Sequence, residues 1–297
     1  MKCDLCPRKC LVDRKKGEKG ICGQTENLKV ARAALHFWEE PCISGDAGSG
    51  AVFFSGCPLH CVFCQNENIA NGMVGKEISL ERLVDIFLEL QEKGANNINL
   101  VTPGHFVPQI VKALDQARKE GLTLPVVYNT SSYETVDTIK MLEGYVDIYL
   151  PDFKYMSPGL SKKYSHAPDY AEVAKAAIAE MVRQTGKAVF VNGDEDNLIL
   201  RGTIVRHLTL PGCMADSMQI LKYLHETYGD MIYISIMNQF TPLSNLEKYP
   251  ELNRRITDEE YETLVDYAIE IGIENGFIQE GDTAEESFIP AFDCEGV

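Results

Sequence analysis

Three cysteines within eight residues form the part of the sequence best suited to metal chemistry. Cys57, Cys61 and Cys64 lie in the stretch SGCPLHCVFCQN with the spacing C-x3-C-x2-C. An odd number of thiols cannot all pair in disulfides, and a closed zinc site takes four ligands. Soft cysteine thiolates suit iron–sulfur clusters, and three of them would hold three irons of a cubane. The spacing therefore predicts a [4Fe-4S] cluster whose fourth iron is open to a small molecule.

A zinc knuckle is the alternative interpretation of this loop, with His60 or Cys42 as the fourth ligand. Short cysteine clusters are also typical of zinc sites. The loop directly follows an apolar run, AVFFS at 51–55, that suits a buried strand. This position, with strand–helix units after it, favours the cluster.

Cysteine usage also marks the N-terminus of the chain. Four cysteines there have the pattern C-x2-C-x3-C-x11-C: Cys3, Cys6, Cys10 and Cys22. Four thiolates at such spacing predict a closed structural site, which would hold either zinc or a second iron–sulfur cluster. The remaining cysteines are expected to be buried thiols: Cys42, Cys213 and Cys294.

Composition limits the classes of protein that fit. The chain has 297 residues, 45% hydrophobic and 24% charged, which is typical of a globular protein with a large core. Its net charge of −16 disfavours nucleic acid as a partner, because an acidic surface repels phosphates. No apolar run is long enough to span a membrane, and the N-terminus lacks the apolar region of a secretory signal. We expect a cytoplasmic protein, in which cysteines bind metals or stay buried as thiols rather than form disulfides.

Strand and helix patterns alternate from Ala51 onward. Short apolar runs predict strands at 51–55, 98–101, 125–129, 146–150, 203–210 and 232–237. Apolar stripes at helical spacing predict helices near 79–94, 108–121, 135–142, 170–185, 216–228 and 257–269. The runs at 188–192 and 197–202 flank an acidic turn and suggest a hairpin. The alternation predicts an α/β fold with a parallel sheet, either a full or partial barrel or an open doubly wound sheet.

The cysteine loop resembles the signature of the radical S-adenosylmethionine superfamily, in which an aromatic residue, here Phe63, precedes the third cysteine. SGCPLHCVFCQN is particularly similar to the activating enzymes of pyruvate formate-lyase, and the resemblance extends from about residue 51 to 240. It implies a partial (β/α)6 TIM-type barrel. It also implies that the open iron binds S-adenosylmethionine, whose reductive cleavage gives a 5′-deoxyadenosyl radical that abstracts a hydrogen atom.

Three regions follow from this resemblance and the cysteine pattern. Residues 1–50 are expected to form a cysteine-rich metal-binding extension. Residues 51–240 would form the radical S-adenosylmethionine barrel, and residues 241–297 a C-terminal helical extension packed on it.

The resemblance implies cofactor contacts after successive strands. Backbone groups near Thr102 and Gly104 stand where the family has a Gly-rich segment. Asn129 and Ser131 occupy the positions of polar residues that touch the cofactor.

Later positions complete the expected site. Asp152 and Lys154 match the family's Asp-Leu-Lys, with side chains on one side of an extended chain. Arg206 and His207 are adjacent in a strand, so only one faces the site, and we favour Arg206. Asn238 or Gln239 stands where activating enzymes carry a histidine.

The functional hypothesis is therefore a glycyl-radical-enzyme activating enzyme. Its expected partners are reduced flavodoxin or ferredoxin as electron donor and a glycyl radical protein as substrate. Alternatives are a radical enzyme acting on a small molecule or peptide, and a zinc-stabilised interaction protein. The segment 156–169, expected to be a basic loop with Lys162 and Lys163, would contact the partner.

Overall fold

The computed structural model describes residues 2–194, 197–242, 246–279, 290 and 292–297. A ten-stranded sheet forms its centre, with the strand order β10-β9-β8-β6-β5-β4-β2-β1-β3 and β7 paired to β8. The strands are β1 (Leu28–His36), β2 (Ser49–Phe54), β3 (Lys76–Ile78), β4 (Ile98–Val101), β5 (Val126–Thr130), β6 (Ile148–Pro151), β7 (Val189–Phe190), β8 (Ile199–Leu208), β9 (Tyr233–Met237) and β10 (Gly276–Ile278).

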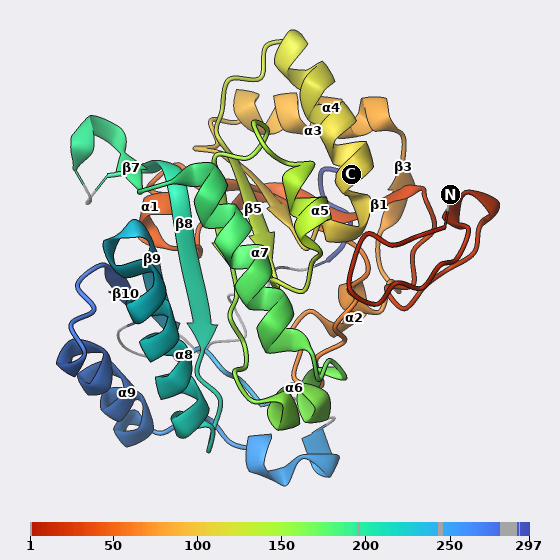
Figure 1. Cartoon of the computed structure of the whole chain (residues 1–297). Coiled ribbons are helices and arrows are strands. Elements are labelled where there is room, and N and C mark those ends of the chain that lie inside the picture. The colour runs from red at the N-terminus through yellow and green to blue at the C-terminus, as the bar shows by residue number, and fades with distance from the viewer. Residues whose placement is uncertain (1, 195–196, 243–245, 280–289, 291) are drawn as a thin grey trace.

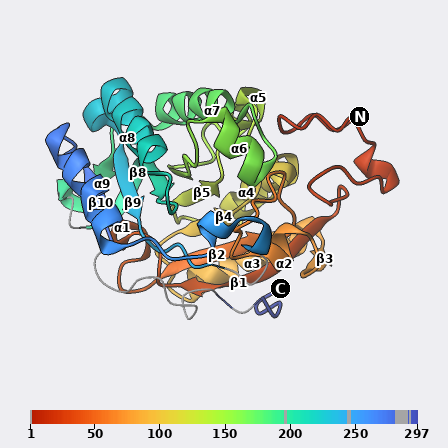
Figure 2. The same ribbon diagram turned by 90° about the horizontal axis from the view of Figure 1, so that it is seen from below.

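Neighbouring strands from β2 to β10 run parallel, as the alternation of strands and helices predicts. The order ends at β10 and β3, which do not pair with each other in the described residues. The sheet is thus an open, partial barrel, which confirms the predicted fold class. Figure 2 shows α7 and α8 lying along one side of the curved sheet.

Helices connect the parallel strands and bury one apolar face each. They are α1 (Pro41–Ser44), α2 (Glu67–Ala70), α3 (Leu80–Glu92), α4 (Val107–Lys119), α5 (Val136–Lys140), α6 (Pro158–Ser165), α7 (Tyr170–Thr185), α8 (Met214–Tyr228) and α9 (Asp258–Glu270). The Ser79 hydroxyl caps α3 by accepting from the Arg82 amide, and Thr257 with Glu260 forms the expected capping box of α9. These caps fix where α3 and α9 begin.

The expected boundary at residue 50 does not separate two units. β1, which the sequence did not predict, pairs antiparallel with both β2 and β3 and so extends the sheet. Its residues alternate less regularly than a half-buried strand, because Val30, Ala31, Ala33 and Ala34 are all buried. Residues 2–27 contribute no strand and lie at the side of the molecule marked N in Figure 1.

The C-terminal region is also more than a helical extension. After α9, the chain adds β10 parallel to β9. The last residues lie against β1, where the Ala33 amide donates to the Glu295 carbonyl at 2.9 Å. Residues 243–245, 280–289 and 291 of this region lie outside the described residues.

The segment 156–169 is not a loop over most of its length, because α6 occupies it. Ser157 caps this helix with Pro158 in its first turn, and the capping was missed in a stretch rich in Pro and Ser. Lys163 pairs with Glu251 at 2.6 Å, so part of the basic charge expected for a partner is already neutralised.

No helix in the described part of the chain is both long and apolar enough to cross a membrane.

Candidate active site

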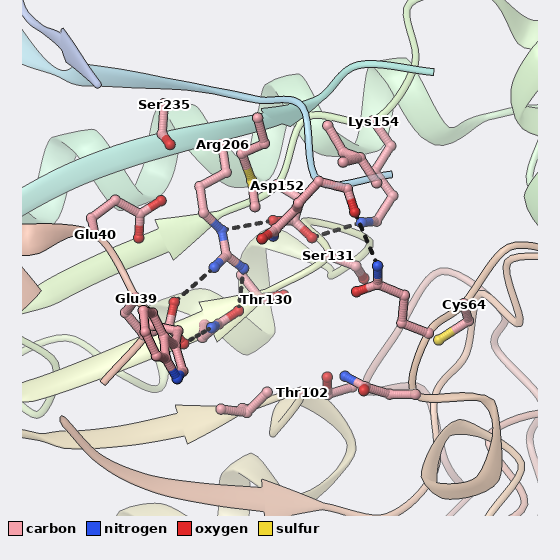
Figure 3. A pocket seen from close by; sticks show the side chains of 18 of the residues that line it. Glu39, Glu40, Cys64, Thr102, Thr130, Ser131, Asp152, Lys154, Arg206 and Ser235 are labelled. Atoms are coloured by element: carbon pink, nitrogen blue, oxygen red, sulfur yellow. Dashed lines mark hydrogen bonds and ion pairs between the residues drawn. The ribbon is translucent and has the colours of Figure 1, made fainter. Parts of the chain in front are cut away.

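A cavity of about 480 Å³ opens where the parallel strands end. Its walls include residues at or just after the carboxyl ends of β4, β5 and β6, and inward-facing side chains of β8 and β9. This is the position at which α/β folds bind ligands, because loops from neighbouring strands converge there. Figure 3 shows the polar side chains of this cavity.

The cysteine loop forms one wall of the cavity. Cys57, Cys61 and Cys64 all line it, in the loop between β2 and α2. The Ser165 hydroxyl at the end of α6 donates to Cys61 Sγ at 2.9 Å and fixes that thiol in place. Three thiols therefore face one space, as a cluster with an open iron requires.

Neither proposed fourth zinc ligand joins them. The ring nitrogens of His60 contact Asn71 Oδ1 at 2.9 Å and the Ile21 carbonyl at 2.8 Å, outside the cavity lining. Cys42 is buried in a different apolar cluster, among residues of β5, β6 and β8. Among the described residues no three His, Cys, Asp or Glu side chains converge as ligands of a single metal ion. The donor set fits a cubane, which spreads its ligands over several irons, and does not fit a zinc knuckle.

Without a bound metal, the thiols in this wall lose their protons less readily than ordinary cysteines. Burial raises the pKa of Cys64 to about 12 and that of Cys57 to about 11, against the weaker opposing effect of Lys154. Thiolates at these positions need a positive group close by, and bound iron is such a group.

A network of buried charges lies beside the cysteine wall. Arg206 Nε donates to Asp152 Oδ1 at 3.0 Å, and Lys154 Nζ donates to Asp152 Oδ2 at 2.6 Å. Burial by itself would raise the pKa of Asp152, but Lys154 and Arg206 outweigh it and hold that pKa below its usual value. Asp152 is thus a carboxylate that orients two cations at the cavity wall.

A glutamate that sequence reasoning missed completes this network. Glu39 Oε2 accepts from Arg206 Nη1 at 2.9 Å, and Glu39 Oε1 accepts from the side-chain amides of Asn99 and Asn129 at 3.1 Å. Arg206 Nη2 donates to Asn129 Oδ1 at 2.7 Å. Glu39 lies in the WEEP stretch before α1 and belongs to no motif. The only local signal is the pair of acidic residues before the Pro that begins the helix.

Most of the residues implied by the resemblance line the cavity. They are Phe63, Thr102, Asn129, Ser131, Asp152, Lys154, Arg206 and Gln239. Thr102 has a left-handed backbone (φ 55°), uncommon for a β-branched residue, and its amide donates to the Asn129 carbonyl at 2.9 Å. This bond ties the ends of β4 and β5 together at the cavity.

Gly104, His207 and Asn238 do not line it. His207 points to the opposite face of β8 from Arg206, where its ring nitrogens contact the Phe153 carbonyl and the Ser217 hydroxyl, both at 2.8 Å. Burial lowers the pKa of His207 to about 4, so it is a neutral core residue. A side chain at Gly104 would lie 2.9 Å from the Glu134 carboxyl carbon, so packing accounts for this glycine.

The N-terminal cysteines gather around a second, much smaller space of about 10 Å³. Cys3, Cys6, Cys10 and Cys22 all line it, with Arg14 and His105 beside them. Burial raises the pKa of Cys6 to about 12. The structure thus brings together the four thiols that the spacing grouped, although no three converge on a single-ion position.

Comparisons with known proteins agree with this arrangement. The model of the Radical SAM superfamily matches residues 51–199, half of the chain. The uncharacterized protein MJ0674 of Methanocaldococcus jannaschii is 27% identical over 276 residues, which cover 90% of this chain and 74% of that protein.

Solved structures share the fold at low identity. Streptococcus suis SuiB bound to S-adenosylmethionine superposes with a TM-score of 0.52 at 13% identity, over 76% of this chain and 48% of SuiB. SuiB bound to its precursor peptide SuiA superposes with a TM-score of 0.51. HydG, a maturase of the [FeFe]-hydrogenase, gives 0.51 at 15% identity, over 78% of this chain and 52% of HydG. The chain spans about half the length of these two proteins. With the cysteine loop at the mouth of a partial barrel and a family match over half its length, the chain belongs to the radical S-adenosylmethionine superfamily.

Proposed function

We propose that this protein is an activating enzyme, which removes a hydrogen atom from a glycine residue of another polypeptide. Its superfamily uses a [4Fe-4S] cluster and S-adenosylmethionine. When bound, the reduced cluster supplies the electron that cleaves the sulfonium to methionine and a 5′-deoxyadenosyl radical. The observation that carries the proposal is the cysteine wall, where Cys57, Cys61 and Cys64 face a ligand-sized cavity and no fourth cysteine lines it among the described residues.

Lys154 and Asp152 are the residues that would hold the amino acid part of S-adenosylmethionine. Lys154 lies in the same cavity wall as the cysteines, and Cys61 contributes to raising its pKa. Burial opposes that charge, but Asp152 and Cys61 outweigh it, so Lys154 stays cationic. A fixed ammonium group is suited to a carboxylate, and Asp152 keeps it oriented.

Asn129 and Ser131 at the end of β5, with Thr102 after β4, offer hydrogen-bonding groups in the same cavity. Phe63 is buried between the cysteines and packs against Tyr155 and Phe240. It therefore excludes water from the cysteine wall, which protects a radical from side reactions.

Two observations support a polypeptide substrate. Trp38 and Ile278 line the cavity and are 63% and 47% exposed, so two large apolar side chains are accessible there. The same fold in SuiB accommodates a precursor peptide. The resemblance of the cysteine loop to activating enzymes favours a glycyl radical protein, with flavodoxin or ferredoxin as the electron donor.

Anaerobic assays with a chemical reductant test this proposal. Reconstituted protein should convert S-adenosylmethionine to 5′-deoxyadenosine and methionine. A candidate glycyl radical protein should then give the doublet EPR signal of a glycyl radical and lose it after Gly→Ala at the acceptor position. Cleavage without any protein radical would favour a small-molecule or peptide substrate, and no cleavage would refute the proposal.

A further inference from the structure

Glu40 is a buried acid of the cavity that the proposed chemistry does not use. It is 8% exposed and lines the cavity at the start of α1. Its carbonyl accepts from the Ile43 and Ser44 amides, and Pro41 occupies the first turn, so the backbone at this position is rigid. Its side chain makes no capping bond. Ser235 on β9, also in the cavity lining, hydrogen-bonds to this carboxyl, so the group is anchored at the cavity wall.

One oxygen of this carboxylate lacks a partner. Glu40 Oε2 is buried and accepts no hydrogen bond from any described residue. Such an atom is costly, because burial removes its water without a replacement. Burial raises the pKa of Glu40, Arg206 opposes this, and Glu39 adds to it. Neighbouring Glu39 accepts from three donors, so the two acids have different roles.

The acidic side chains that line the cavity outnumber the cationic ones, and Glu40 is the acid without an ion pair among the described residues. Glu39, Glu40 and Asp152 supply three acidic side chains, whereas Arg206 and Lys154 supply two cations among the described lining residues. Arg206 contacts Glu39 and Asp152, and Lys154 contacts Asp152. His36, also in the lining, is kept neutral because burial, with Arg32 and Arg206, lowers its pKa.

Glu40 lies far from the cysteine wall. Figure 3 shows Glu40 and Cys64 at opposite sides of the cavity, with Arg206 and Asp152 between them. The amino acid part of S-adenosylmethionine belongs beside the cysteines. Glu40 consequently faces the space left for the molecule that gives up the hydrogen atom.

We propose that Glu40 binds a cationic group of the substrate, a lysine or arginine side chain or a free amine close to the hydrogen donor. Such a group would donate to Oε2 and favour the ionised form of Glu40, whose pKa burial otherwise raises. This inference rests on the proposed function and adds the charge of the substrate to it.

A matched pair of peptides tests the assignment. The probes are N-acetyl-Gly-Lys-Gly-amide and its norleucine analogue, which differ by the ammonium group. Their Kd is measured by calorimetry on protein that carries the cluster and S-adenosylmethionine. The lysine peptide should bind about tenfold or more tightly than the analogue, as a buried charged hydrogen bond provides. Glu40→Gln should remove this preference and Glu40→Asp should restore part of it, while Glu92→Gln, an exposed control on α3, should keep it.

Three results would overturn the inference. They are equal affinity for both peptides in the natural protein, a preference that survives Glu40→Gln, and a loss of S-adenosylmethionine affinity in Glu40→Gln as large as in Lys154→Met. The last would place Glu40 in the cofactor site. 5′-Deoxyadenosine formation is measured on the same samples, because its absence means that the proposed function itself has failed.

Discussion

Arg8 Nε donates to the carbonyl oxygen of Pro58 at 2.9 Å, so the N-terminal cysteine segment holds the loop that carries Cys57. The same guanidinium donates to the carbonyls of Ser165 and His166 at 3.0 and 2.6 Å, and Ser165 in turn donates to Cys61. One side chain thus connects the four-cysteine segment to two of the three cysteines at the cavity.

We expect Arg8→Ala to loosen the cysteine loop and to speed loss of iron. Three hydrogen bonds from a charged group are removed, two of them part-buried, and a hydrogen bond to a charged group contributes on the order of 1.5–3 kcal/mol at most in such a position. The rate of cluster loss to a chelator, followed anaerobically by absorbance, should rise several-fold.

Arg118→Ala is the matched control for this change. Arg118 also donates to two carbonyls, those of Gly144 and Tyr145, and lies over the Tyr145 ring as Arg8 lies over the Tyr133 ring. Arg118 is on α4, away from the cysteine loop. Equal rates of iron loss in the two variants would show that Arg8 has no particular effect on the cluster.

Replacement of Cys57, Cys61 or Cys64 by Ala should abolish reductive cleavage of S-adenosylmethionine, because two thiolates cannot hold a cubane with one open iron. The EPR spectrum of the reduced natural protein should change when S-adenosylmethionine is added. Cys213→Ala, outside the cavity lining, should keep both properties. Formation of 5′-deoxyadenosine by Cys61→Ala would contradict the cluster assignment.

Lys154→Met should weaken S-adenosylmethionine binding by about 1–3 kcal/mol, roughly five- to 150-fold in Kd, because it removes a fixed cation from a carboxylate site. Equilibrium dialysis on cluster-loaded protein measures the effect. Lys112→Met, an exposed change on α4, is the control. Unchanged affinity in Lys154→Met would make the Asp152–Lys154 pair purely structural.

The N-terminal cysteines should hold a metal centre of their own. Cys6→Ser should remove either zinc or one iron–sulfur cluster, while the iron bound at the cavity remains detectable. Metal analysis and Mössbauer spectra of this variant distinguish the two metals, with Cys294→Ser as the control. If the metal content of Cys6→Ser matched the natural protein, the four thiols would be free.

Much of the site was predictable because its parts are local in the chain. The spacing of Cys57, Cys61 and Cys64 places three thiols on one loop wherever that loop lies. Asp152 and Lys154 face the same way because alternate residues of an extended segment do so. The same period assigned opposite faces to Arg206 and His207, and the structure places Arg206 in the cavity. The parallel strands were also predictable, since apolar runs and capped helices alternate along the chain.

Other relationships depend on which segments meet in space. The sequence by itself determined the spacing of the three cysteines, the caps of α3 and α9, and the α/β pattern, each encoded within a few residues. Only the tertiary structure brought Glu39 to Arg206, because the WEEP stretch packs beside β8, and the two residues are 167 positions apart in the chain. It alone joined Arg8 to Pro58, fifty residues apart. Such contacts depend on strand order and loop packing, and no local periodicity reports them.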